Sequence, residues 1–87
     1  MTQPTILITG ANRGLGLKFT DLYAQKKFNV LATCRAPQNA ERLLELAEQN
    51  DLISIYPLDV GIHEEIEDLA LKIKDVPIDI LINNAGI

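Results

Sequence analysis

The sequence predicts an α/β fold in which helices cover a parallel sheet. Short apolar runs rich in β-branched residues alternate with amphipathic stretches along the chain, in the order β-α-β-α-β-α-β. The connections between strands are therefore crossovers, which make neighbouring strands parallel and are right-handed in nearly all proteins. Three such crossovers favour the strand order 3-2-1-4, that of a doubly wound sheet halted after its fourth strand. A glycine-rich turn after the first run is the third observation that agrees with this fold.

Four apolar runs are the expected strands, at residues 5–9, 28–33, 52–56 and 78–82. The first run is continuous up to Gly10, which is typical of a strand covered on both faces. Pro57 has no N–H to donate, so it indicates where the ladder pairing of the third strand stops.

Three amphipathic stretches are the expected helices, at about residues 14–27, 38–49 and 62–73. Apolar side chains recur at helical spacing in the first stretch, and they predict its buried face: Leu15, Phe19, Leu22 and Tyr23. In the third stretch, Glu64 and Glu65 lie in the first turn, where the helix dipole favours anions.

The composition indicates one small globular domain. Hydrophobic residues make up 47% of the 87 residues and charged residues 23%, whereas disordered chains have fewer apolar and more charged residues. No apolar run approaches the roughly 20 residues of a membrane span. The first residues also lack the cationic and apolar segments of a signal peptide. Because Cys34 is the single cysteine, no internal disulfide forms, and we expect a reducing, cytoplasmic setting.

The net charge of −4 is unevenly distributed along the chain. Residues 1–40 carry five basic residues and one acidic residue, whereas residues 41–87 carry three basic and eleven acidic residues. The acidic total argues against a nucleic-acid partner. A small anionic ligand held by the first half remains compatible with it.

A glycine-rich turn lies where the first strand meets the first helix, from Thr9 to Gly16. Gly10 permits a tight exit from the strand, and Gly14 lets backbone N–H groups approach a pyrophosphate. Gly16 allows the helix to pack closely on the sheet, while the helix N-terminus faces the negative charge. Three glycines at this junction of a parallel pattern predict a dinucleotide site; the alternative is a merely structural turn.

Three motifs together resemble the classical short-chain dehydrogenase/reductase family, which has a Rossmann-like, NAD(P)-binding fold. Thr9 to Gly16 is similar to the family's T-G-x-x-x-G-x-G motif. Leu58-Asp59-Val60 follows the third strand, and Asn83-Asn84-Ala85-Gly86 follows the fourth, matching the family's N-N-A-G. The segments Thr33-Cys34-Arg35 and Asn84-Ala85-Gly86-Ile87 are most similar to the carbonyl-reductase-like branch of the family, which includes C-factor and sniffer proteins. The resemblance implies that residues 1–87 are the N-terminal dinucleotide-binding half of such a domain.

The resemblance assigns cofactor contacts to several residues. It places Asp59 against the adenine ring, although an aspartate between a strand and a helix can instead shape or cap the turn. It gives Asn83 and Asn84 two roles, contact with the cofactor and linkage between strands of the sheet. The residues expected to bind cofactor are Gly10, Asn12, Arg13, Gly14, Leu15, Gly16, Arg35, Asp59, Val60, Asn83, Ala85 and Gly86.

The residues after the second strand indicate which cofactor is preferred. An acidic residue there accepts hydrogen bonds from a free 2′-hydroxyl, whereas arginine binds a 2′-phosphate. The chain has Cys34 at that position, followed by Arg35, and Arg13 points into the same region in the family. These features favour NADP(H) over NAD(H). The alternative is that one or both arginines are simply solvated.

The family's catalytic serine, tyrosine and lysine lie beyond N-N-A-G and have no counterparts in this chain. Tyr23 and Lys27 match the spacing Y-x-x-x-K, but they lie in the first helix and are expected to serve packing. Cys34 is expected to lack a redox role and His63 to be solvated. With no second histidine or cysteine nearby, metal binding is not expected.

Two function classes therefore remain. One is the NADP(H)-binding portion of a truncated reductase, an oxidoreductase that is inactive without the missing residues. The alternative is a naturally short, non-catalytic module that binds dinucleotide or a protein. Another Rossmann-like protein, such as a methyltransferase, fits the glycine spacing and Asn83-Asn84 less well. In either class, the outer edge of the fourth strand or the apolar face of the third helix is expected to support self-association.

Overall fold

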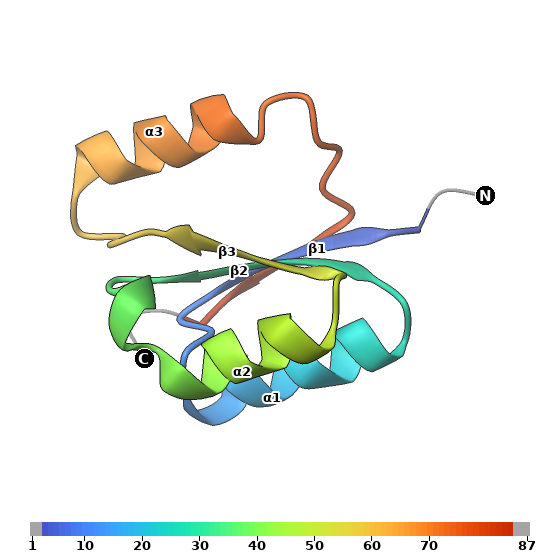
Figure 1. Ribbon diagram of the computed structural model, residues 1–87. Helices are drawn as coiled ribbons and strands as arrows, with labels where there is room; N and C mark the ends of the chain where they lie inside the picture. The colour runs from blue at the N-terminus through green and yellow to red at the C-terminus, as the bar shows by residue number, and fades with distance from the viewer. Residues whose placement is uncertain (1–2, 85–87) are drawn as a thin grey trace.

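The computed structural model describes residues 3–84 and shows a four-stranded parallel sheet with helices on both faces (Figure 1). In chain order the elements are β1 Thr5–Thr9, α1 Gly14–Gln25, β2 Asn29–Cys34, the 3-10 helix η1 Pro37–Asn39, α2 Glu41–Gln49, β3 Ile53–Pro57, α3 His63–Lys72 and β4 Ile80–Asn83. The strand order is β3-β2-β1-β4, and every pairing is parallel. The predicted fold class and the predicted strand order are both confirmed.

The strand register brings the carboxyl ends of the strands to one edge of the sheet. Thr9, the last residue of β1, pairs with Asn83 of β4, and Cys34 of β2 pairs with Pro57 of β3. Pro57 is the last residue of its strand, as predicted. The loops that follow these strands therefore start side by side at this edge.

Helix α1 packs on the sheet through small side chains. Its buried residues are Gly16, Thr20 and Ala24, spaced four apart along one stripe. Leu15 and Leu22, which were predicted to be buried, are 62% and 45% exposed. For these two residues the prediction was wrong, because close approach of a helix to a sheet requires small side chains at the contact line, and larger ones must flank it. Phe19 and Tyr23, the other two residues of the predicted face, are partly buried and pack against the core.

The C-terminus of α1 is a Schellman motif. The Phe28 N–H donates to the Tyr23 carbonyl at 3.0 Å, and the Lys27 N–H donates to the Ala24 carbonyl at 3.0 Å. The Tyr23 and Phe28 rings meet edge to face at 5.0 Å, which supplies the apolar contact of the motif. Lys27 has a φ of 70° and lies beyond the helix. Tyr23 and Lys27 are therefore not one helical turn apart, because α1 ends two residues earlier than predicted.

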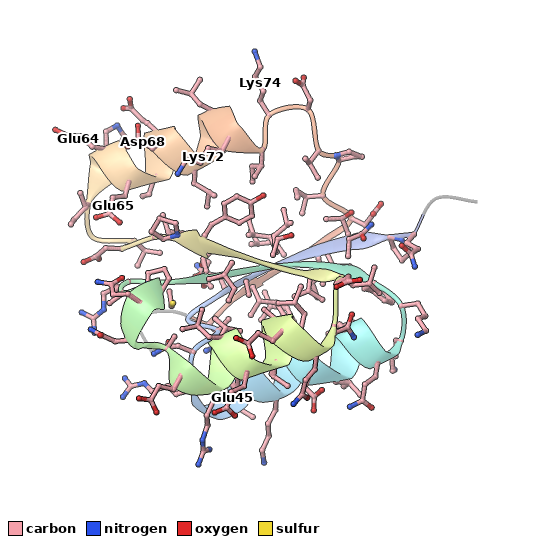
Figure 2. The ribbon with its side chains drawn as sticks, viewed as in Figure 1. Glu45, Glu64, Glu65, Asp68, Lys72 and Lys74 are labelled. Carbon is pink, nitrogen blue, oxygen red and sulfur yellow. The ribbon has the colours of Figure 1, made fainter. Side chains whose placement is uncertain are left out.

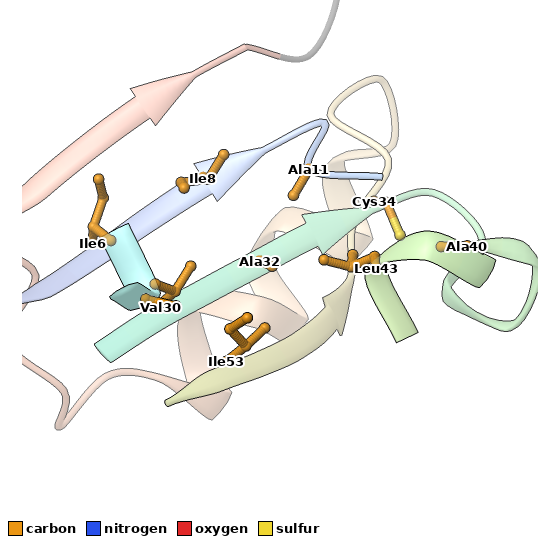
Figure 3. Close-up of a cluster of buried hydrophobic side chains, with 10 residues drawn as sticks. Ile6, Ile8, Ala11, Val30, Ala32, Cys34, Ala40, Leu43 and Ile53 are labelled. Carbon is orange, nitrogen blue, oxygen red and sulfur yellow. The ribbon is translucent and has the colours of Figure 1, made fainter. Parts of the chain in front are cut away.

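Helices α1 and α2 cover the same face of the sheet (Figure 1). The 3-10 helix η1 forms after Pro37, so α2 begins at Glu41 rather than near residue 38. Leu43 of α2 is fully buried and belongs to a cluster with side chains from β1 and β2, which Figure 3 shows in close-up. This cluster is the main core of the protein.

Helix α3 lies on the opposite face and packs against β3 (Figure 1). Leu69 is its buried residue, whereas Ile62, which precedes the helix, and Ile66 are 44% and 42% exposed. On β4, Leu81 is 60% exposed. This face of the sheet is thus covered over β3 and open over β4. Among residues 3–84, no helix has the length and apolar character needed to cross a membrane.

Candidate functional site

A cavity of about 820 Å³ lies at the carboxyl edge of the sheet. Its walls come from the loops after β1, β2 and β3 and from Asn84, which follows β4. These predicted site residues line it: Gly10, Asn12, Arg13, Gly14, Leu15, Arg35, Asp59 and Val60. The structure therefore brings together side chains from three separate loops that the sequence had marked.

The loop from Gly10 to Gly14 needs glycine for its backbone conformation. Gly10 has a φ of 63° and Gly14 a φ of 54°, in the left-handed region that residues with a Cβ rarely adopt. A Cβ on Gly14 would meet no atom within 4 Å. At Gly14 the requirement is thus one of backbone angle and not of space.

Gly16 has a different role, because it does not line the cavity. A Cβ on Gly16 would lie 2.1 Å from the Gly10 carbonyl oxygen and 2.8 Å from Nδ2 of Asn84. The same Nδ2 donates a hydrogen bond to the Gly10 oxygen at 3.1 Å. Gly16 therefore lets the first turn of α1 lie directly against the strand-exit loop and holds the cavity wall in place.

The N-terminus of α1 faces the cavity without a side-chain cap. Arg13 is the N-cap residue, and its side chain makes no capping hydrogen bond. The first turn contains no acidic residue. The backbone N–H groups of this turn and the positive end of the helix dipole favour a bound anion at this point.

The residues after β2 form the basic side of the cavity. Arg35 is exposed and lines the cavity, as do Ala36 and Asn39. Cys34 is 3% exposed, and burial raises the pKa of its thiol, which a backbone hydrogen bond with Ala36 partly offsets. Cys34 is the last residue of β2, as the expected strand-end position required, and burial with a raised pKa makes its thiol a weaker nucleophile.

Asp59 is both a turn residue and a cavity residue. Its Oδ1 accepts a hydrogen bond from the Gly61 N–H at 2.9 Å, and its carbonyl accepts one from the Ile62 N–H at 2.9 Å. The turn-shaping alternative is therefore correct, and it holds together with the predicted position at the cavity. Among the described residues that line the cavity, the charged ones are Arg13, Arg35 and Asp59.

The two asparagines after β4 connect it to β1. Thr9 Oγ1 donates to Asn83 Oδ1 at 3.0 Å and accepts from the Asn84 N–H at 2.9 Å. Asn84 lines the cavity, whereas Asn83 does not. Ala85 and Gly86, which were also predicted to bind cofactor, lie outside the described residues.

Several lining residues were not among the predicted site residues: Cys34, Ala36, Asn39, Leu58 and Asn84. Leu58 and Asn84 lie next to predicted site residues, within the motifs Leu58-Asp59-Val60 and Asn83-Asn84-Ala85-Gly86. Ala36 and Asn39 come into place through η1, a short turn that has no apolar periodicity to mark it.

Residues 3–84 contain no group of three histidine, cysteine, aspartate or glutamate side chains that could hold a metal ion. His63 is exposed and pairs with Glu67, one turn along α3, at 2.6 Å. This pairing agrees with the solvated position that was expected for His63.

Comparison with known proteins identifies the family and the fold. The family model for short chain dehydrogenases matches residues 4–87. The uncharacterized oxidoreductase YusZ of Bacillus subtilis is 38% identical over 99% of this chain and 32% of its own length. The NADP-dependent 3-hydroxy acid dehydrogenase YdfG of Escherichia coli is 39% identical over 94% of this chain and 33% of its own length. The chain thus spans about a third of the length of these curated relatives.

Solved structures agree with these matches. A carbonyl reductase from Pseudomonas aeruginosa in complex with NADP superimposes with a TM-score of 0.91, at 35% identity, over 98% of this chain and 39% of that protein. The putative carbonyl reductase Sniffer of Caenorhabditis elegans gives a TM-score of 0.81 at 29% identity, over 100% of this chain and 39% of that protein. One is a carbonyl reductase and the other a putative carbonyl reductase.

Proposed function

Because the chain belongs to the short-chain dehydrogenase family, we propose that residues 1–87 form the N-terminal dinucleotide-binding half of an NADP(H)-dependent reductase. The observation that carries the proposal is the presence of Arg13 and Arg35 in one cavity with an uncapped helix N-terminus. NADP(H) supplies the hydride that such a reductase exchanges with a carbonyl or alcohol group. A cytoplasmic location, expected from the single cysteine, is part of the proposal.

Each wall of the cavity suits one part of the cofactor. The first turn of α1 and the loop from Gly10 to Gly14 would hold the pyrophosphate through backbone N–H groups. Arg35, with Arg13, would hold the 2′-phosphate through charged hydrogen bonds. Asp59 and Val60 would lie beside the adenine ring. The segment after β4, where Asn84 lines the cavity, would approach the ribose; of the residues predicted there, Asn83 does not line the cavity, and Ala85 and Gly86 lie outside the described residues.

Calorimetric titration with NADPH and NADH tests the preference. We expect NADPH to bind at least about tenfold more tightly, and Arg35→Ala to remove most of that difference, because a charged hydrogen bond to phosphate is lost. Lys18→Ala is the matched control, since it removes one positive charge from the exposed side of α1, away from this cavity. Equal affinity for the two cofactors, or tighter NADH, would contradict the role of Arg35.

We further propose that the chain self-associates with a second copy of itself through the outer edge of β4. This strand lies at the edge of the sheet, and its Ile80 and Leu81 are 37% and 60% exposed. An apolar edge with unpaired backbone groups favours pairing with another chain. The apolar face of α3, with Ile62 and Ile66, is the alternative contact.

Sedimentation velocity separates the two contacts. Leu81→Lys is expected to restore a monomer if β4 is the contact, and Ile66→Lys if α3 is. A wild-type chain that stays monomeric at high concentration would rule out self-association through either surface.

A further inference from the structure

The loop between β3 and α3 lacks the usual side-chain cap at its helix. Ile62 is the N-cap residue of α3, and it makes no side-chain capping hydrogen bond. Gly61, which precedes it, has no side chain to offer. Another group must therefore satisfy the backbone N–H groups of this loop. The conformation of the loop matters for the site, because Asp59 and Val60 line the cavity.

Glu65 provides that group from the first turn of α3. Its Oε1 accepts a hydrogen bond from the backbone N–H of Asp59 at 3.0 Å, across six residues of chain. Figure 2 shows the labelled Glu65 side chain reaching from α3 toward the loop that follows β3. The carboxylate of Glu65 is half-buried and is not itself among the residues that line the cavity.

The contact of Glu65 complements the contact that Asp59 makes with its own turn. Oδ1 of Asp59 accepts the Gly61 N–H at 2.9 Å, so the Asp59 side chain is oriented by the loop. The Asp59 N–H is oriented by Glu65. Two carboxylates thus fix one short loop, and hydrogen bonds to a charged acceptor are among the stronger ones in proteins.

We infer that Glu65 is a positioning residue that holds Asp59 and Val60 in place as the adenine-side wall of the cavity. The inference rests on the proposed function for the identity of the ligand. It predicts that loss of the Glu65 acceptor weakens binding of the adenine end of the ligand and leaves binding of the pyrophosphate end unchanged. The pyrophosphate end depends on α1 and the glycine loop, whereas the carboxylate of Glu65 is hydrogen-bonded to the Asp59 N–H on the other side of the cavity.

Two fragments of the cofactor separate the two ends in the 87-residue chain. Titrations use adenosine 2′,5′-bisphosphate for the adenine end and inorganic pyrophosphate for the other. Glu65→Ala is expected to lower the affinity for the adenine fragment about tenfold, the effect of losing one charged hydrogen bond. The affinity for pyrophosphate is expected to stay the same. Glu65→Gln keeps an oxygen acceptor at the same position and is expected to restore most of the affinity.

Glu64→Ala is the matched control, because Glu64 lies in the same first turn and carries the same charge. Its substitution removes one negative charge near the positive end of the helix dipole, as Glu65→Ala does, but it leaves the Asp59 contact intact. Equal weakening by Glu64→Ala and Glu65→Ala would overturn the inference, because the effect would then be one of charge alone.

Hydrogen exchange at the Asp59 amide tests the same contact without any ligand. Exchange is expected to be faster in Glu65→Ala than in the wild type and near the wild-type rate in Glu65→Gln. An unchanged rate in Glu65→Ala would overturn the inference. If the wild-type chain binds neither fragment, the proposed function fails, and the exchange rates still decide whether Glu65 holds the loop.

Discussion

The two faces of the sheet differ in how completely they are covered. On the face covered by α1 and α2, the side chains of Ile6, Ile8 and Val30 are fully buried. Side chains alternate along a strand, so Leu31 and Leu81 point to the other face. There Leu31 on β2 is 6% exposed, whereas Leu81 on β4 is 60% exposed.

The difference shows which part of the chain carries its stability and which part carries its site. The α1 and α2 layer provides a closed core and fixes the glycine loop through the contact of Gly16 with Gly10. On the other face, Leu69 is the buried residue of α3, and the hydrogen bond of Glu65 with Asp59 joins the helix to the loop that precedes it. The cavity lies between the glycine loop and the loop after β3. We therefore expect its glycine-loop side to be held more firmly than the side formed by Asp59 and Val60.

The largest expected effect comes from a cavity-forming substitution in each layer. Ile8→Ala is expected to cost about 3 kcal/mol of unfolding free energy, because a fully buried side chain is lost from a closed core. Ile66→Ala is expected to cost about 1 kcal/mol, because that side chain is already 42% exposed. Urea unfolding followed by circular dichroism measures both losses. Equal losses would mean that the two faces are equally closed.

A smaller effect is expected from adding a methyl group at one glycine of each layer. Gly16→Ala is expected to cost about 2 kcal/mol, because the new Cβ would collide with the Gly10 carbonyl oxygen in the backbone. At Gly61 the Cβ would lie 3.3 Å from Oδ1 of Asp59, so a shift of a few tenths of an ångström in that side chain would accommodate it with the hydrogen bond to the Gly61 N–H kept. Gly61→Ala is expected to change the stability by less than about 0.5 kcal/mol.

Thermal unfolding compares the two alanine variants. A variant Gly16→Ala with the wild-type melting temperature would contradict the close approach of α1 to the strand-exit loop. A large loss in Gly61→Ala would instead indicate that the loop before α3 is as tightly packed as the glycine loop.

The fold could be predicted because each layer repeats a simple pattern. Apolar runs such as that ending at Gly10 marked the strands, and the alternation with helices fixed the parallel order. The contact stripe of α1 could not be predicted in the same way. Hydrophobic periodicity selects large side chains such as Leu15, whereas a close helix–sheet contact selects Gly16, Thr20 and Ala24.

The candidate site was predictable where it depends on local backbone geometry. Positive φ at Gly10 and Gly14 follows from a tight turn that a glycine motif signals in the sequence. The contribution of Asn39 depends on η1, and the hold of Glu65 on Asp59 depends on the path of a whole loop. No sequence spacing marks Asn39 or Glu65 for these roles, because both contacts form only when separate segments of the chain fold together.

The helix ends provide the last and smallest test of the comparison. Helix α1 closes with a full Schellman motif and the Tyr23–Phe28 contact, whereas the Ile73 N–H at the end of α3 donates to the Leu69 carbonyl within an ordinary last turn. Lys27 occupies the left-handed position of the motif at a φ of 70°, where a side chain is strained. Lys27→Gly is therefore expected to stabilise the protein by about 0.5–1 kcal/mol.

The matched control for Lys27→Gly is Lys26→Gly, at the neighbouring residue with a φ of −81°. That change removes the same charge without relieving strain, so it is expected to destabilise the protein slightly. Urea midpoints of the two variants measure the difference. If both changes destabilise the chain, the left-handed turn at Lys27 is not strained in solution. If Lys27→Gly raises the midpoint of the whole transition, the end of α1 unfolds together with the closed core rather than fraying from it.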